Sequence, residues 1–419
     1  MKRSLIILLT SIALYNLSAL FYAAALFQFA LNLGIKSERI RQIATTVVAS
    51  GFLIQTLGMT FRWIEAGLIE VEAYIQGAGE ILEGYAYWQV LTQHPPWSNL
   101  YEIMGYMAWG LVLVFLVCEI QWRSPLLGIF SLLLALTALG IAAFYAGPIK
   151  PLVPALKSWW IMIHVISASI AYASGTVAAI ASFLYLVKTQ NPGSEPRLRR
   201  GVLGTSMAVI LVLGRGFTLF STQVYQVEQT AVPGVGWMMI TYLALASAGI
   251  LLNKSMARYA YFLALADLLT ILALLSLHSP IHVWDLALLA IMALGQCFVG
   301  LSLLFPKDLD RLLPSVRQLD HIAYSNVLVA FALVAIVLVT GALWAHYAWG
   351  RYWGWDPKET GALVIWITYA LYLHSRIAYG WSKSRSAVIA VFGFFVILAG
   401  FLGVNLGWFA DGLHGYGRS

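Results

Sequence analysis

The chain has 419 residues, of which 61% are hydrophobic and only 10% are charged. Soluble domains are about a quarter charged, so this composition excludes a soluble globular protein and predicts an all-α polytopic membrane protein. The net charge of +7 is no sign of nucleic-acid binding, because Lys and Arg gather in the cytoplasmic loops of membrane proteins and set their orientation.

Long apolar runs predict about twelve transmembrane helices. The basic start, Met1–Arg3, resembles a signal peptide, but its apolar run continues to Phe29 without a clear cleavage site, so we interpret it as the first span. The predicted spans are about 4–29, 43–62, 103–122, 126–146, 159–187, 202–220, 236–253, 259–277, 284–305, 325–346, 360–380 and 386–404.

The loops between these spans alternate between rich and poor in Lys and Arg. The basic loops are expected on the cytoplasmic side, which puts 63–102, 347–360 and the tail 405–419 on the outer face; only Lys2 and Arg3 disagree. Within the largest outer loop, 63–102, the Glu-rich stretch 64–92 predicts a helix lying on the membrane surface, and Ser98 or Asn99 is placed to begin the next helix.

An aromatic segment, Trp344–Trp366, stands between two of the last apolar runs and holds five tryptophans. Aromatic residues gather at membrane interfaces in any case, but that tendency does not explain Trp349, Trp353 and Trp355 crowded into one loop. We predict that this outer-face segment holds a flat aromatic ligand, most simply haem, against the indole faces.

The charged residues of the same loop have structural and ligand-binding interpretations. Asp356, followed by Pro357, is typical of a helix start, and we favour that role over direct contact with a ligand. Arg351 and Lys358 are placed either to pair with haem propionates or to reach the membrane interface.

Two of the eight histidines lie well inside predicted spans, where an ionisable residue is a functional candidate. His164 lies about one turn inside the fifth span, and His374 lies deeper in the eleventh. His346 adjoins the aromatic loop and is either a further ligand or a structural residue, whereas a lone tail histidine such as His414 has no meaning by itself. Cys118 and Cys297 lie in apolar runs, so we expect neither to belong to a disulfide or metal site. No C-x-x-C-H is present, so the chain is not expected to attach a c-type haem to itself.

The run W-G-R-Y-W-G-W-D-P-K-E-T resembles the tryptophan-rich "WWD" signature of haem-handling proteins, in the form found in the CcsA (ResC) family of cytochrome c biogenesis. Further stretches of the same family pattern are P-P-W-S-N-L-Y-E from 95, W-I-M-I-H from 160, Y-L-H-S-R from 372 and G-L-H-G-Y-G from 412. The resemblance covers about 50–188 and 318 to the end.

The resemblance implies a haem lyase that joins haem to apocytochrome c on the outer or lumenal side of a bacterial inner membrane or a thylakoid membrane. It implies that His164 and His414 ligate haem b at an outer site, with Trp353, Trp355 and Asp356 beside them as catalytic candidates. It also implies that His374 belongs to an inner haem site, whose second ligand comes from a CcsB (ResB) partner protein. Beyond haem, the expected partners are that protein, apocytochrome c and membrane lipid.

We divide the chain into 1–188, an inserted block of about four spans at 202–305, and the WWD region at 318–419. The block is a departure from the eight spans expected of the family, and it either replaces part of the partner protein, binds another subunit or serves as scaffold. Two alternatives to the haem lyase function also stay open. One is a haem transporter or chaperone without ligation activity. The other is a haem-binding membrane subunit of a respiratory complex.

Overall fold

The computed structural model describes residues 2–79, 81–92, 95–97, 99–144, 149, 152, 156–189, 313–381 and 384–403. The chain forms two compact units, one made of Met1–Tyr185 with Pro314–Ser419 and the other of Leu186–Leu313. The four spans predicted at 202–305 and the tail histidine His414 lie outside the described residues. Over the residues that are described, every regular element is a helix, which confirms the all-α prediction.

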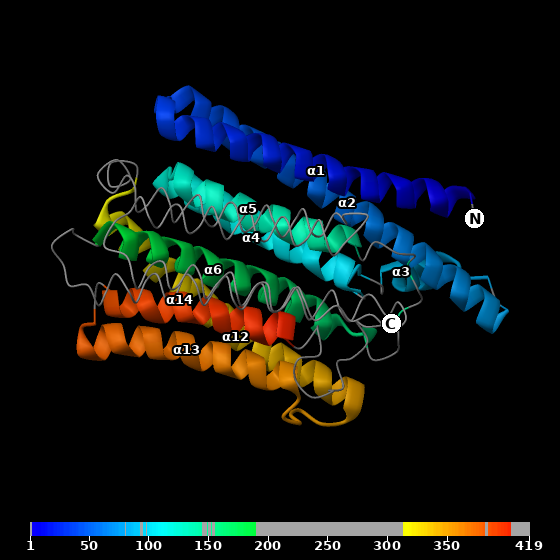
Figure 1. Ribbon diagram of the computed structural model, residues 1–419. Helices are drawn as coiled ribbons and strands as arrows, with labels where there is room; N and C mark the ends of the chain where they lie inside the picture. The colour runs from blue at the N-terminus through cyan, green and yellow to red at the C-terminus, as the bar shows by residue number, and fades with distance from the viewer. Residues whose placement is uncertain are drawn as a thin grey trace, which may run out of the picture. The chain divides into compact units, whose positions relative to one another are not determined.

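The described part has nine α-helices, of which all but the short α3 coincide with the eight spans predicted there. In chain order they are α1 Lys2–Ile35, α2 Glu38–Ala78, α3 Gly84–Thr92, α4 Leu100–Trp122, α5 Pro125–Phe144, α6 Trp159–Thr189, α12 Val316–Trp349, α13 Pro357–Tyr379 and α14 Ser384–Leu398, with a π-helical turn at Ala399–Gly403 (Figure 1). Seven of them are long and apolar enough to cross a membrane. The 23-residue α13 is not among those seven, and it has charged residues near both ends.

The predicted surface helix at 64–92 is wrong. Helix α2 continues unbroken for 41 residues, about 60 Å at 1.5 Å per residue, and only the short α3 folds back on it. Trp63 Nε1–H donates to the Thr92 carbonyl at 3.3 Å. Two of the glutamates that suggested a wet surface, Glu65 and Glu70, are buried, and Glu70 accepts hydrogen bonds from Lys157 Nζ and from the Leu152 amide. A carboxylate count cannot distinguish solvated from internally paired side chains.

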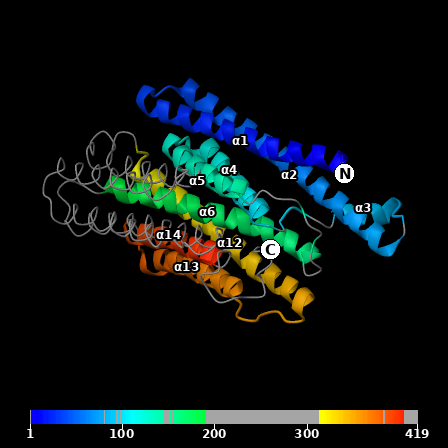
Figure 2. The same ribbon diagram turned by 45° about the vertical axis from the view of Figure 1, so that its right-hand side comes forward.

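Helix α6 is the central element of the first unit. In both views it lies between the α4–α5 pair and the helices α13 and α14, while α12 passes behind it (Figures 1 and 2). A side chain at Gly110 of α4 would lie 2.9 Å from the Ser169 carbonyl oxygen, so this glycine lets α4 and α6 approach closely. On the other side, Ala171 and Ala178 of α6 join an apolar core with residues of α12, α13 and α14. Helix α6 is therefore held on both sides.

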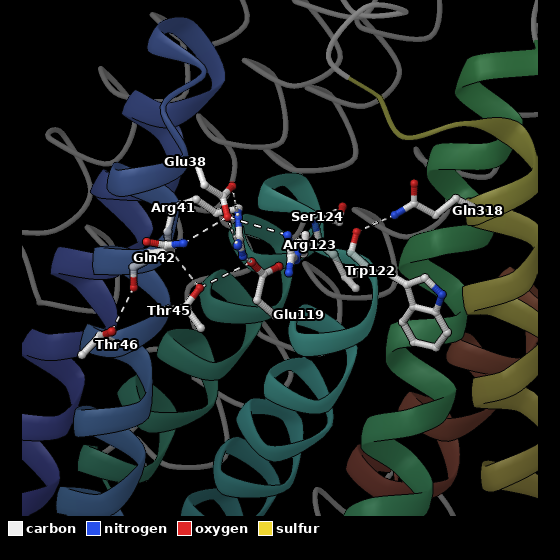
Figure 3. Close-up of polar contacts among 11 residues, drawn as sticks. Glu38, Arg41, Gln42, Thr45, Thr46, Glu119, Trp122, Arg123, Ser124 and Gln318 are labelled. Carbon is white, nitrogen blue, oxygen red and sulfur yellow. Dashed lines mark hydrogen bonds and ion pairs between the residues drawn. The ribbon is translucent and has the colours of Figure 1, made fainter.

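Polar contacts tie the helices together at the end where α2 begins (Figure 3). Arg41 of α2 pairs with Glu119 of α4, which is buried, and with Glu38 of its own helix. Gln318 of α12 donates to the Trp122 carbonyl at the end of α4, at 2.6 Å. These contacts fix the relative positions of α2, α4 and α12, and so of the far end of α12, which leads into the aromatic loop.

Candidate functional site

The aromatic loop, Gly350–Asp356, joins α12 to α13. Gly350, with a φ of 72°, ends α12, a left-handed conformation that costs glycine little. Asp356 caps α13 by accepting a hydrogen bond from the Lys358 amide at 3.0 Å, and Pro357 follows in the first turn. The predicted helix-start role of Asp356 is confirmed.

Glu359 shapes the loop from inside α13, and the sequence reasoning missed it. Its Oε2 accepts the amide hydrogens of Gly354 at 2.8 Å and Asp356 at 3.2 Å. The second contact completes a capping box with Asp356. The signal was present as an acidic residue three positions after the cap. Because one carboxylate binds two loop amides, the loop holds its indole rings on a defined backbone.

Two indoles of this loop differ in orientation. Trp355 is 70% exposed, whereas Trp353 is only partly exposed, and their rings lie 5.6 Å apart at 88°. Perpendicular rings cannot both lie flat against one planar ligand. In this arrangement the exposed ring of Trp355 is the one accessible for stacking, and the Trp353 ring lies perpendicular to it.

A row of aromatic contacts connects the loop with His164. Trp349, at the end of α12, lies 5.1 Å from buried Trp344, and the Trp344 ring lies 6.3 Å from the imidazole of His164 on α6. The structure thus brings one predicted ligand, His164, next to the predicted aromatic platform through a tryptophan that had no predicted role of its own.

His164 makes one hydrogen bond that decides its chemistry. Its Nδ1 lies 2.9 Å from the carbonyl oxygen of Val337 on α12. A carbonyl only accepts, so Nδ1 carries the proton and donates, and Nε2 keeps its lone pair. Ligand histidines commonly show this arrangement, in which the outer nitrogen donates to a backbone carbonyl and the other binds metal.

His374 lies far from His164 and faces outward. Arg376, two residues after His374, pairs with Asp320 of α12, whereas His164 contacts Val337, 17 residues further along the same helix. Those 17 residues span roughly 25 Å. One iron cannot bind two ligands at that separation. The His374 side chain is exposed on α13, on the same stripe as exposed Ile367 and Leu371.

The remaining predicted residues lie around the loop. His346 stacks in parallel on Tyr352, with ring centroids 4.3 Å apart and 7° between the planes. The Arg351 guanidinium folds over Gly354, where a side chain would lie 1.8 Å from Nη1. His414, the predicted second outer ligand, lies outside the described residues.

Comparison with known proteins adds a family to this geometry. Residues 97–410 match the family model described as "Cytochrome C assembly protein". Similar relatives carry the name "Cytochrome c biogenesis protein CcsA". One from Rippkaea orientalis is 32% identical over 88% of this chain and 96% of its own length, and one from a Nostoc species is 34% identical over 77% and 80%. A third, from Gloeobacter violaceus, is 28% identical over 97% and 93%.

Proposed function

Because the chain belongs to the CcsA family of cytochrome c biogenesis proteins, we propose that it joins haem to apocytochrome c beside the aromatic loop. The family makes it an integral membrane protein of cytochrome c maturation, and hence a haem-handling protein. The observation that carries the proposal is His164, whose Nε2 has a free lone pair next to a tryptophan-rich loop.

The residues of this end of the molecule fit haem b as a substrate. Haem iron takes histidine readily, and His164 is in the tautomer that a ligand requires. Trp355 offers an exposed flat face. Arg351, also exposed, is suited to bind a propionate through two N–H groups. We assign the second axial position to His414 on the basis of the G-L-H-G-Y-G match alone.

The exposed His374 supports a second, inner site completed by another protein. A histidine within a membrane-spanning segment is costly unless it is partnered, yet the only ring contact recorded for it among the described residues is Tyr379, at 5.5 Å. We assign its missing partner to a CcsB-type membrane protein that covers this face of α13. Haem would then pass from His374 to the loop end, which we place on the outer or lumenal side.

The proposed reaction is thioether formation with the C-x-x-C-H segment of the apocytochrome. Haem supplies two vinyl groups. At each one a cysteine S–H adds across the C=C bond, so that a C–S bond forms, the proton goes to the other vinyl carbon, and nothing is oxidised or reduced. The residues of this chain hold the iron and the ring plane while the segment approaches, and the segment's histidine replaces one axial histidine. Proximity and orientation therefore supply most of the rate gain.

Expression in cells lacking their own synthetase, with and without a CcsB-type partner, tests this function. We expect covalent haem on a reporter cytochrome only when both proteins are present. His164→Ala and His414→Ala should each lose most of it, and added imidazole should restore part. His321→Ala, on the exposed surface of α12, is the matched control and should behave as wild type.

Two outcomes would contradict the proposal. Bound haem without covalent product in the presence of the partner would indicate a haem carrier. Wild-type haem content and cytochrome yield in both His164→Ala and His414→Ala would refute the ligand assignment.

A further inference from the structure

The imidazole of His164 rests on a place in α12 where the chain has no side chain. A Cβ added at Gly341 would lie 2.9 Å from Cε1 and 3.0 Å from Nδ1 of His164. Both distances are shorter than ordinary van der Waals contact, so even alanine at 341 requires the ring to move.

At Gly341, as at Gly105 and Gly175, the ring of another helix lies where a glycine side chain is missing, in contrast to Gly110. The nearest atoms to a Cβ at Gly110 belong to the backbone of Ser169, as expected where a glycine lets two helices approach. Apart from its chain neighbours and the nearby backbone of α12 itself, the only described atoms within 4 Å of a Cβ at Gly341 are two atoms of the His164 ring. Gly341 therefore makes room for an imidazole and not for a neighbouring backbone.

Gly341 also leaves room beside the Val337 carbonyl, the hydrogen-bond partner of the His164 ring. Val337 precedes Gly341 by one helical turn, so a side chain at 341 would lie beside the Val337 carbonyl. Thr340 directs its hydroxyl chiefly at the Ile336 carbonyl, 2.7 Å away, and lies 3.4 Å from the Val337 oxygen. The Val337 oxygen is thus open to the Nδ1–H of His164 at 2.9 Å.

We propose that Gly341 is a positioning residue for the axial ligand. By leaving the Val337 carbonyl accessible, it seats His164 in the Nδ1–H tautomer and directs Nε2 away from α12. The proposal rests on the proposed role of His164 as a haem ligand. It explains why a glycine occurs in the interior of the apolar helix α12, where it costs about 1 kcal/mol relative to alanine.

The test compares Gly341→Ala and Gly341→Val with Gly140→Ala in the full-length protein co-expressed with its CcsB-type partner. Gly140 lies in the spanning helix α5 with nothing within 4 Å of its added Cβ, so it controls for losing a glycine in a membrane helix. The readouts are the visible spectrum of bound haem, which reports low-spin bis-histidine ligation, and the haem affinity in titrations of purified protein. We expect affinity to fall on the order of 10-fold in Gly341→Ala and further in Gly341→Val, with recovery of the low-spin spectrum on adding imidazole.

A double-mutant cycle distinguishes a role of Gly341 in positioning His164 from a role in general helix packing. If Gly341 acts through His164, Gly341→Ala should have no further effect on haem binding in a His164→Ala background. Wild-type ligation spectra and affinity in both Gly341 variants, with haem lost in His164→Ala, would overturn the positioning role alone. Unchanged haem in His164→Ala as well would instead refute the proposed function. Equal losses from Gly341→Ala in both backgrounds would assign Gly341 to packing.

Discussion

Trp355 combines an exposed indole with a backbone conformation that suits glycine. Its φ is 56°, and the left-handed region costs an L-residue about 1–2 kcal/mol. Strained residues persist where the surroundings impose them, often at functional sites. Here Glu359 fixes the amides on either side, Gly354 and Asp356. The chain therefore keeps a bulky aromatic residue at a position where glycine would relax the backbone, which agrees with a role for the exposed indole face.

Substituting Trp355 with glycine and with alanine separates these two contributions. We expect Trp355→Gly to be more stable to thermal unfolding than Trp355→Ala by about 1 kcal/mol, because glycine accepts the positive φ without strain. Both variants should lose haem retention to the same extent, because both lack the indole. Thermal unfolding in detergent and the haem-to-protein ratio after purification measure the two effects.

The control for the Trp355 variants is Trp381→Ala, a substitution outside the loop. Haem retention unchanged in both Trp355 variants would show that the loop is only an interfacial belt. Higher stability of the alanine variant would show that the left-handed backbone at 355 carries no strain.

At the scale of helices, a buried ionic contact joins α2 to α4. Arg62 and Glu102 are both fully buried, with Nε 3.1 Å from Oε1, and the guanidinium also lies over the ring of Tyr101 at 5.1 Å. Glu65, nearly as buried, lies 3.6 Å from the same guanidinium. Removing one partner of such a pair leaves an uncompensated buried charge, which costs about 3–5 kcal/mol.

Glu102→Gln and Arg62→Met should therefore each lower stability by about 3 kcal/mol or more. Glu72→Gln, on the exposed side of the same α2, should change it by less than about 0.5 kcal/mol. The triple variant Arg62→Met, Glu65→Leu and Glu102→Leu should recover much of the loss, because apolar side chains then replace the whole buried cluster and no buried carboxylate is left without a partner. Thermal unfolding of the purified protein checks the series, and single variants no less stable than Glu72→Gln would rule out an energetic role for the contact.

The same region shows where sequence reasoning succeeds and where it fails. Apolar runs predict the described helices because a membrane span needs a fixed length of apolar chain, and Asn99 caps α4 as expected by accepting from the Glu102 amide. The continuation of α2 to Ala78 was missed, because burial of Glu70 depends on Lys157, which lies 87 positions away. The hydrogen bond of His164 was missed for a similar reason, because its partner is a backbone carbonyl and a sequence pattern does not show which backbone carbonyl a side chain will contact.

At the scale of the whole molecule, the two predicted ligands in the described part, His164 and His374, lie in separate places. His164 lies inward against α12 near the aromatic loop, whereas His374 lies roughly 20–25 Å away along the helices and outward on α13. Helix α13 has charged residues near both ends, and it presents Ile367 and Leu371, each about half exposed, on the stripe of His374. A partner covering that stripe would complete the proposed inner site without altering the loop end.

A spin-label experiment tests whether a CcsB-type protein covers this stripe. Cysteines placed at Ile367, Leu371 and the buried Leu373 of α13, in a chain carrying Cys118→Ala and Cys297→Ala, receive a nitroxide label in liposomes. Collisions with O₂, which is concentrated in the bilayer, report contact with lipid. Without the partner, the labels at 367 and 371 should collide much more often than the label at 373, which is only 8% exposed.

With the partner present, collisions at 367 and 371 should fall to the value at 373. Leu53 of α2, which is 63% exposed, serves as the lipid-facing control and should keep its value. An equal fall at 53 would mean that the protein aggregates, and unchanged collisions at 367 and 371 would place the partner elsewhere. In the second case His374 would need a ligand from another source, and the haem content of His374→Ala, measured with and without the partner, would show whether an inner site forms at all.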